Sequence, residues 1–147
     1  MLAYGHAAGS PGAARQMKLR VRFAETDQMG VAHHSAYVVW LEAARVEWLR
    51  RRGLSYREME EAGLSLAVSR LEVTYRAAVY FDDELTLVPR LESVRSRRVA
   101  YSYRVERDGL LVATAVNEHV PTDRSGRATT VPARWLEPML DLLANDP

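Results

Sequence analysis

The sequence predicts a two-layer α+β domain in which an antiparallel sheet curls around one long helix. Residues 36–52 form a helical pattern that is apolar on nearly every side in its first half, so other elements must surround this helix. Four long strand-like segments follow it along the chain. Strands that cover a single buried helix form a two-layer architecture, with one core between the layers.

Another strand precedes the helix, which makes five. Residues 18–23 alternate, and we expect Leu19, Val21 and Phe23 to face the core. Similar alternation in the next strand predicts that Leu71, Val73 and Tyr75 share a buried face. The later strands are predicted at residues 66–77, 84–95, 98–107 and 110–120, and a last helix at 133–143.

Short sequence motifs indicate how some of these elements begin, turn and pair. Ser55 stands before Glu58 at capping-box spacing and predicts a short second helix. The dipeptide Asp108-Gly109 is typical of a two-residue turn between antiparallel strands, because both positions need a positive φ. Pro89 has no backbone N–H, so its strand is expected at a sheet edge or with a bulge.

Length and composition favour one folded domain. Of 147 residues, 48% are hydrophobic and 27% charged, with a net charge of +1 and no cysteine. Near-neutral charge argues against a nucleic-acid or membrane partner, and the lack of cysteine excludes disulfides and thiolate chemistry. Residues 1–17 are expected to be a flexible extension, residues 18–147 a single domain, and the setting cytoplasmic.

The loop between the first strand and the helix contains the best candidates for chemistry. Residues 26–35 include Asp27, His33 and His34, and the first helical amides lie at residues 34–37. Those amides lack helical acceptors and, with the helix dipole, are suited to polarising a carbonyl group. Asp27 then serves as nucleophile or general base, although a lone loop aspartate is more often a turn residue.

Two other groups of residues are rival candidates for a functional site. Glu42 is a second carboxylate in an apolar stretch, and we expect an ion pair with Arg45 to neutralise it. His33, His34 and His119 lack the spacing of a metal motif, so no metal and no cofactor are predicted.

Basic turns are the candidates for binding phosphate groups. Arg95, Arg97 and Arg98 cluster between two strands, and guanidinium groups bind phosphates in bidentate fashion. A solvated turn is the equally weighted alternative. Arg124 and Arg127 form a weaker candidate of the same kind.

The motif Thr26-Asp27-Gln28-Met29-Gly30-Val31, followed by His34, Tyr37 and Trp40-Leu41-Glu42-Ala43-Ala44-Arg45, resembles the signature of hydroxybenzoyl-CoA-type thioesterases. The resemblance extends to about Pro132. It implies the hotdog fold, with the five-stranded sheet curled around the central helix, and an acyl-CoA substrate bound at the interface of a homodimer or homotetramer.

By the same resemblance, Asp27 is the catalytic carboxylate and the backbone N–H of His34 polarises the thioester. Gly30 and Tyr37 belong to the substrate site, and Arg95, Arg97 and Arg98 contact the CoA phosphates. One departure is Ala36, where many relatives carry Asn. Three alternatives stay open: an acyl-CoA-binding module without turnover, a hotdog dehydratase that uses His34 and Glu42, and, least favoured, a nucleic-acid-binding protein.

Overall fold

The computed structural model of the protein describes residues 15–145. Most of the predicted extension, residues 1–14, lies outside this range, but Met17 already belongs to the first strand. The strands are β1 (Met17–Arg20), β2 (Ser65–Tyr75), β3 (Glu84–Arg95), β4 (Arg98–Arg107) and β5 (Leu110–Thr122). The helices are α1 (Ala36–Arg51), α2 (Tyr56–Glu61) and α3 (Ala133–Asn145), with a 3₁₀ turn at Phe23–Glu25.

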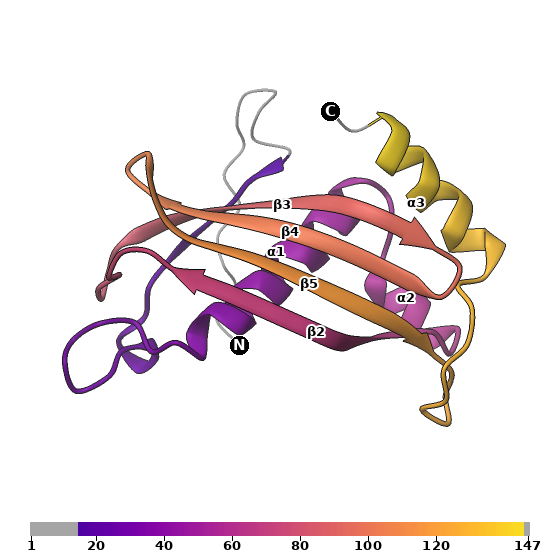
Figure 1. Ribbon diagram of the computed structural model, residues 1–147, viewed down its shortest axis with the longest axis horizontal. Helices are drawn as coiled ribbons and strands as arrows, with labels where there is room; N and C mark the ends of the chain where they lie inside the picture. Colours follow the sequence, from indigo (N-terminus) through magenta and orange to yellow (C-terminus); the bar gives the residue numbers. More distant parts are fainter. Residues whose placement is uncertain (1–14, 146–147) are drawn as a thin grey trace. The chain divides into compact units, whose positions relative to one another are not determined.

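The five strands form one sheet in the order β1-β3-β4-β5-β2, which Figure 1 shows for β3, β4, β5 and β2. The predicted sequence of elements is confirmed, because every predicted strand and helix occurs in its expected place. The β4–β5 turn is also confirmed, with a φ of 51° at Asp108 and 77° at Gly109. Both outer strands, β1 and β2, leave one edge without a strand neighbour.

The chain divides into two compact units. The first contains the described residues up to Trp48, together with Val73–Pro89 and Tyr103–Ala115. The second contains Leu49–Glu72, Arg90–Ser102 and the described residues from Val116 onwards.

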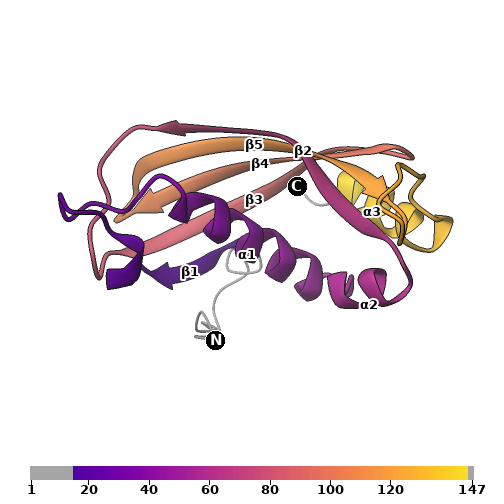
Figure 2. The same cartoon turned by 90° about the horizontal axis from the view of Figure 1, so that it is seen from below.

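In the first unit, α1 lies against one face of the strands (Figure 2). Apolar side chains of the helix and of the strands are almost completely buried there, and this burial is the main force that stabilises the unit. They include Leu19, Val21, Tyr37, Trp40, Leu41, Ala44, Leu85, Leu87, Tyr103, Val105 and Val112.

Three expectations about this unit are wrong. Phe23 was expected in the core, but β1 ends at Arg20 and the side chain is 77% exposed in the 3₁₀ turn that follows. Helix α1 is not enclosed on every side, because Val38 and Val39 are about half exposed. Glu42 is exposed and forms no ion pair among the described residues, whereas buried Arg45 donates to the hydroxyl of Tyr103 over 3.3 Å.

Pro89 does not mark an edge strand, since β3 lies between β1 and β4. The register of β1 nevertheless ends at the pair Met17 and Leu87, before Pro89 is reached. The missing N–H of Pro89 therefore falls where β3 has no partner on the β1 side, and the physical reason for the prediction holds locally.

Strand β2 was expected to bury one face, and this expectation is also wrong. Its residues are exposed or half-exposed from Ala67 onwards, including Val68 at 55%, Leu71 at 36% and Tyr75 at 47%. The strand lies at the sheet edge, so it has a strand neighbour on one side only. Alternation of apolar residues predicted the strand but not how deeply it is buried.

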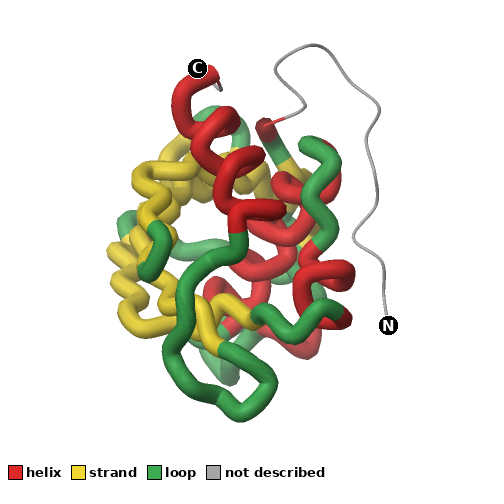
Figure 3. Tube along the Cα trace, turned by 90° about the vertical axis from the view of Figure 1, so that its right-hand side faces the viewer, coloured by secondary structure: helices red, strands yellow, loops and turns green. Residues whose placement is uncertain are grey.

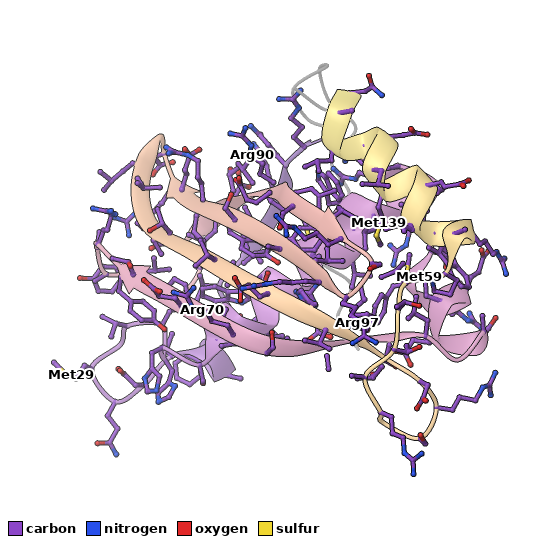
Figure 4. The ribbon with its side chains drawn as sticks, turned by 45° about the vertical axis from the view of Figure 1, so that its right-hand side comes forward. Met29, Met59, Arg70, Arg90, Arg97 and Met139 are labelled. Carbon is purple, nitrogen blue, oxygen red and sulfur yellow. The ribbon has the colours of Figure 1, made fainter. Side chains whose placement is uncertain are left out.

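The second unit has a core of its own. Ser55 caps α2 as predicted, because its side chain accepts a hydrogen bond from the Glu58 N–H. Met59 of α2 and Met139 of α3 are fully buried, and both are labelled in Figure 4. A loop between β5 and α3 leads into the last helix (Figure 3), and the Val131 N–H in this loop donates to the Ser96 carbonyl over 2.7 Å.

No helix within residues 15–145 is long and apolar enough to span a membrane.

Candidate active site

The loop that carries Asp27 belongs to the first unit and is held by backbone hydrogen bonds. Thr26 forms a β-bridge with Ala32, and Val31 forms another with Tyr80. The turn between them closes through Gly30, whose φ of 78° favours glycine. Met29 lies at the tip, is 85% exposed and points away from the ribbon (Figure 4). The loop is therefore a defined hairpin-like turn.

The Asp27 carboxylate has two different oxygens in this loop. Its Oδ1 accepts a hydrogen bond from the Met29 N–H over 2.8 Å, which is the turn contact expected of a structural aspartate. The other oxygen accepts no hydrogen bond from residues 15–145. One oxygen thus fixes the rotamer, and the second is left for a ligand or for water.

The turn just before α1 contains a backbone donor that has no acceptor within the described residues. The Ser35 N–H donates to the His33 Nδ1 atom, and the Ala36 N–H donates to the His33 carbonyl. The His34 N–H, by contrast, makes no hydrogen bond within residues 15–145. The His34 N–H lies two residues before Ala36, where α1 begins, and a donor close to the positive end of a helix dipole favours a partial negative charge.

A pocket of about 440 Å³ is lined by both Asp27 and His34. Its volume falls within the range of small-molecule sites, roughly 300–1,000 Å³. Most of its wall is apolar or aromatic, as is usual for such sites. The lining residues are Asp27, Val31, Ala32, His34, Tyr37, Tyr75, Arg76, Ala77, Ala78 and Val79.

Two tyrosines shape the inner wall of the pocket. The Tyr75 hydroxyl donates to the His34 carbonyl over 3.0 Å, and the rings of Tyr37 and Tyr75 meet edge to face at 4.9 Å. Burial raises the pKa of Tyr37, and proximity to Tyr75 raises it further, whereas Arg107 lowers it. Burial also raises the pKa of Tyr75, so both side chains act as neutral groups, and Tyr75 links β2 to the turn before α1.

Arg107 anchors the segment that contributes Ala77, Ala78 and Val79 to the pocket lining. Its guanidinium group contacts the Ala78 carbonyl at 2.6 Å and the Asp83 carboxylate at 3.1 Å. A half-buried arginine with two oxygen partners is a structural anchor. Arg76, which also lines the pocket, differs from Arg107, since its side chain is exposed and forms no hydrogen bond or ion pair with residues 15–145. The alternating pattern of residues 66–77 did not indicate that Arg76 lines a pocket, because alternation carries no information on pocket walls.

A second, smaller cavity of about 370 Å³ lies in the same unit and is lined by Glu25, Arg22, His33, Ser35 and Ala36, among others. The buried Glu25 carboxylate accepts hydrogen bonds from Trp40 Nε1 at 2.7 Å and from the Arg22 N–H at 2.8 Å. Its backbone carbonyl accepts from the His33 N–H at 2.7 Å.

Burial opposes the charge on Glu25, but the hydrogen bonds from Arg22 and Trp40 outweigh it and lower its pKa. The sequence analysis missed this residue. The spacing of three residues between Arg22 and Glu25 could have indicated their ion pair, because a tight turn brings such residues together. The contact with Trp40 could not be predicted in this way, because it joins residues 15 apart in the chain.

The remaining predicted site residues lie in the second unit. Arg95 and Arg97 are exposed and form no ion pair with described residues, whereas Arg98 is paired with Glu118. Arg124 donates to the Glu61 carbonyl, so it has a structural partner. Within residues 15–145, no three metal-binding side chains cluster, and the rings of His33 and His34 stack at 4.0 Å.

Comparison of the sequence and the structure with known proteins identifies the family of this chain. The model of the thioesterase-like superfamily matches residues 21–140. An acyl-CoA thioesterase of Haemophilus influenzae is 30% identical over 98 residues, which cover 66% of this chain and 72% of that protein.

Two solved structures agree with this match. A protein of Thermus thermophilus has a TM-score of 0.84 at 40% identity, covering 87% of this chain and 98% of the other. A DHNA-CoA thioesterase of Staphylococcus aureus has a TM-score of 0.83 at 26% identity, covering 89% and 91%. The family model covers well over half of the sequence, and the predicted hotdog fold and enzyme class are confirmed. The chain belongs to the thioesterase-like superfamily of hotdog-fold enzymes.

Proposed function

We propose that this protein hydrolyses acyl-CoA thioesters, with Asp27 as the catalytic carboxylate and the His34 N–H as the donor to the thioester oxygen. The observation that carries the proposal is that Asp27 and His34 line one pocket and that each has a hydrogen-bonding position unused by residues 15–145. Relatives named as acyl-CoA thioesterases support the substrate class.

The chemistry follows from the charge that develops during the reaction. As a nucleophile adds to the carbonyl carbon, negative charge builds on the carbonyl oxygen. The His34 N–H and the positive end of α1 stabilise that charge more than they stabilise the neutral thioester, so the barrier falls. The apolar part of the pocket lining lowers the local dielectric constant and strengthens this interaction.

Asp27 can act in two ways. As nucleophile, its oxygen bonds to the carbonyl carbon, the C–S bond breaks, CoA leaves as thiolate, and water then cleaves the resulting anhydride. As general base, it takes a proton from a water that attacks the carbonyl carbon directly. Turnover in ¹⁸O-labelled water separates the routes, because only the anhydride route labels the Asp27 side chain, which mass spectrometry detects.

The phosphate groups of CoA are assigned to the turn that contains Arg95 and Arg97. Both guanidinium groups lack an ion-pair partner among the described residues, which supports the assignment, whereas the pairing of Arg98 with Glu118 makes it a weaker contributor. Replacing Arg95 or Arg97 by Ala should raise KM for an acyl-CoA but not for the matching acyl-pantetheine. An equal rise for both substrates would contradict the assignment.

Assembly as a homodimer or homotetramer is also proposed. Support comes from β2, an edge strand that exposes Val68 and Leu71 and has a strand neighbour on one side only among the described residues. Light scattering should give at least twice the monomer mass for the wild type, and Val68→Lys should shift it toward the monomer. A monomeric wild type would reject the assembly.

The deciding experiment measures release of CoA thiol from aromatic and aliphatic acyl-CoAs by the wild type and by Asp27→Asn. Asparagine keeps an oxygen for the Met29 N–H, so the loop should persist while turnover falls by about 100-fold or more. Glu42→Gln is the matched control and should retain activity. Undiminished turnover in Asp27→Asn would reject Asp27, and binding without turnover by the wild type would favour the non-catalytic module.

A further inference from the structure

The pocket that contains Asp27 also contains one cation, Arg76, that the proposed chemistry does not use. Hydrolysis as described needs a carboxylate and a backbone donor, and neither touches a guanidinium group in the described structure. A positive charge at a pocket wall attracts an anion and discourages a purely apolar occupant. Arg76 is therefore a candidate for selecting the substrate.

Comparison with Arg107 shows why Arg76 is suited to a ligand. Arg107 is held by the Asp83 carboxylate and the Ala78 carbonyl, so its donors are already used within the protein. Arg76 forms no hydrogen bond or ion pair with residues 15–145 and makes no salt bridge with Asp27 across the pocket. Its backbone is nevertheless fixed, because the Arg76 N–H donates to the Val112 carbonyl over 2.8 Å.

The position in the pocket indicates which part of the substrate Arg76 meets. It lines the same pocket as Asp27 and His34, the two residues proposed to act on the thioester carbonyl. The phosphates of CoA are separated from that carbonyl by the whole pantetheine arm, whereas the far end of a short acyl chain stays within the same pocket. An anionic group that reaches Arg76 therefore belongs most simply to the acyl chain.

We propose that Arg76 selects acyl-CoA substrates whose acyl group carries a carboxylate at its far end. A guanidinium fork matches a carboxylate in bidentate geometry, and the aromatic and apolar wall formed with Tyr37 and Tyr75 accommodates the methylene chain between the two ends. This inference names the substrate class of the proposed thioesterase site, and it rests on that proposed function.

The test compares two substrates of equal chain length, glutaryl-CoA and pentanoyl-CoA. In the wild type, kcat/KM should favour glutaryl-CoA by about tenfold or more. In Arg76→Met the ratio should fall to about one, and in Arg76→Glu it should fall below one because the charge is reversed. Arg90→Met is the control, since Arg90 is an exposed strand arginine outside the pocket (Figure 4), and it should keep the wild-type ratio.

Other outcomes overturn the inference. A wild type without preference for glutaryl-CoA would reject it, as would a ratio unchanged by Arg76→Met. An equal loss on both substrates would assign Arg76 to the CoA portion instead. If no substrate is hydrolysed, the proposed function fails, but calorimetric Kd values for the same two thioesters still test the selectivity, which should again be lost in Arg76→Met.

Discussion

Two carboxylates separated by one residue, Asp27 and Glu25, line different cavities of the same unit and differ in how many hydrogen bonds the protein donates to them. Glu25 is buried and receives hydrogen bonds from Trp40 and from Arg22, so its charge is satisfied by the protein. Asp27 is exposed on its pocket and keeps one oxygen that residues 15–145 do not use. The contrast suggests that Glu25 supports the fold and that Asp27 is available for chemistry.

The largest expected effect on stability comes from Glu25→Ala. It leaves buried Trp40 Nε1 and the Arg22 N–H without this acceptor, and each lost buried partner costs about 1–3 kcal/mol. The free energy of unfolding, measured by urea denaturation, should fall by about 2–4 kcal/mol. Exposed Glu58→Ala is a comparison from α2, and an equal loss there would contradict the structural role of Glu25.

The pH dependence of stability offers a second test. The pKa of Glu25 is lowered in the folded protein, so its ionised form stabilises the fold above the ordinary value of 4.5. That stabilisation is lost as the pH falls through the lowered folded pKa. The difference in unfolding free energy between wild type and Glu25→Gln should therefore be largest at neutral pH and shrink in acid. A difference that grows in acid would have the wrong sign.

A smaller effect is expected from Tyr75→Phe. The variant loses the hydrogen bond to the His34 carbonyl but keeps the ring against Tyr37. Because Tyr75 is 47% exposed, water can replace the lost donor, and stability should fall by only about 0.5–1 kcal/mol. We expect kcat/KM to fall by about two- to fivefold as the helix start loosens. Unchanged kcat/KM would show that this contact does not position the site.

The smallest change in stability should come from Asp27→Asn, which has the largest expected effect on turnover. Its amide oxygen can still accept from the Met29 N–H, so thermal and urea unfolding should stay within about 0.5 kcal/mol of the wild type. Asp27→Ala removes the turn contact and is the matching control. A large loss in Asp27→Asn would make Asp27 a structural residue like Glu25.

Patterns local in the chain were predicted well, and contacts between distant segments were not. The Ser55 cap, the Asp108-Gly109 turn and the element order depend on neighbouring residues, whose geometry is set by backbone sterics. The predicted ion pair between Glu42 and Arg45 was wrong because helical spacing does not determine which neighbour a buried arginine contacts. Arg45 donates to the Tyr103 hydroxyl instead. The predicted burial of Phe23 was wrong because the alternating pattern continues in the sequence beyond Arg20, where the strand ends.

The sequence by itself determined the five strands, the long helix, the loop with Asp27 before the helix start and, through its motif, the family. Only the tertiary structure decided that β2 lies at an edge, that Glu25 is buried against Trp40, and that Arg76 shares a pocket with Asp27 and His34. The physical reason is that backbone sterics and hydrophobic periodicity act over a few residues, whereas burial and pocket walls depend on which distant segments meet when the chain folds.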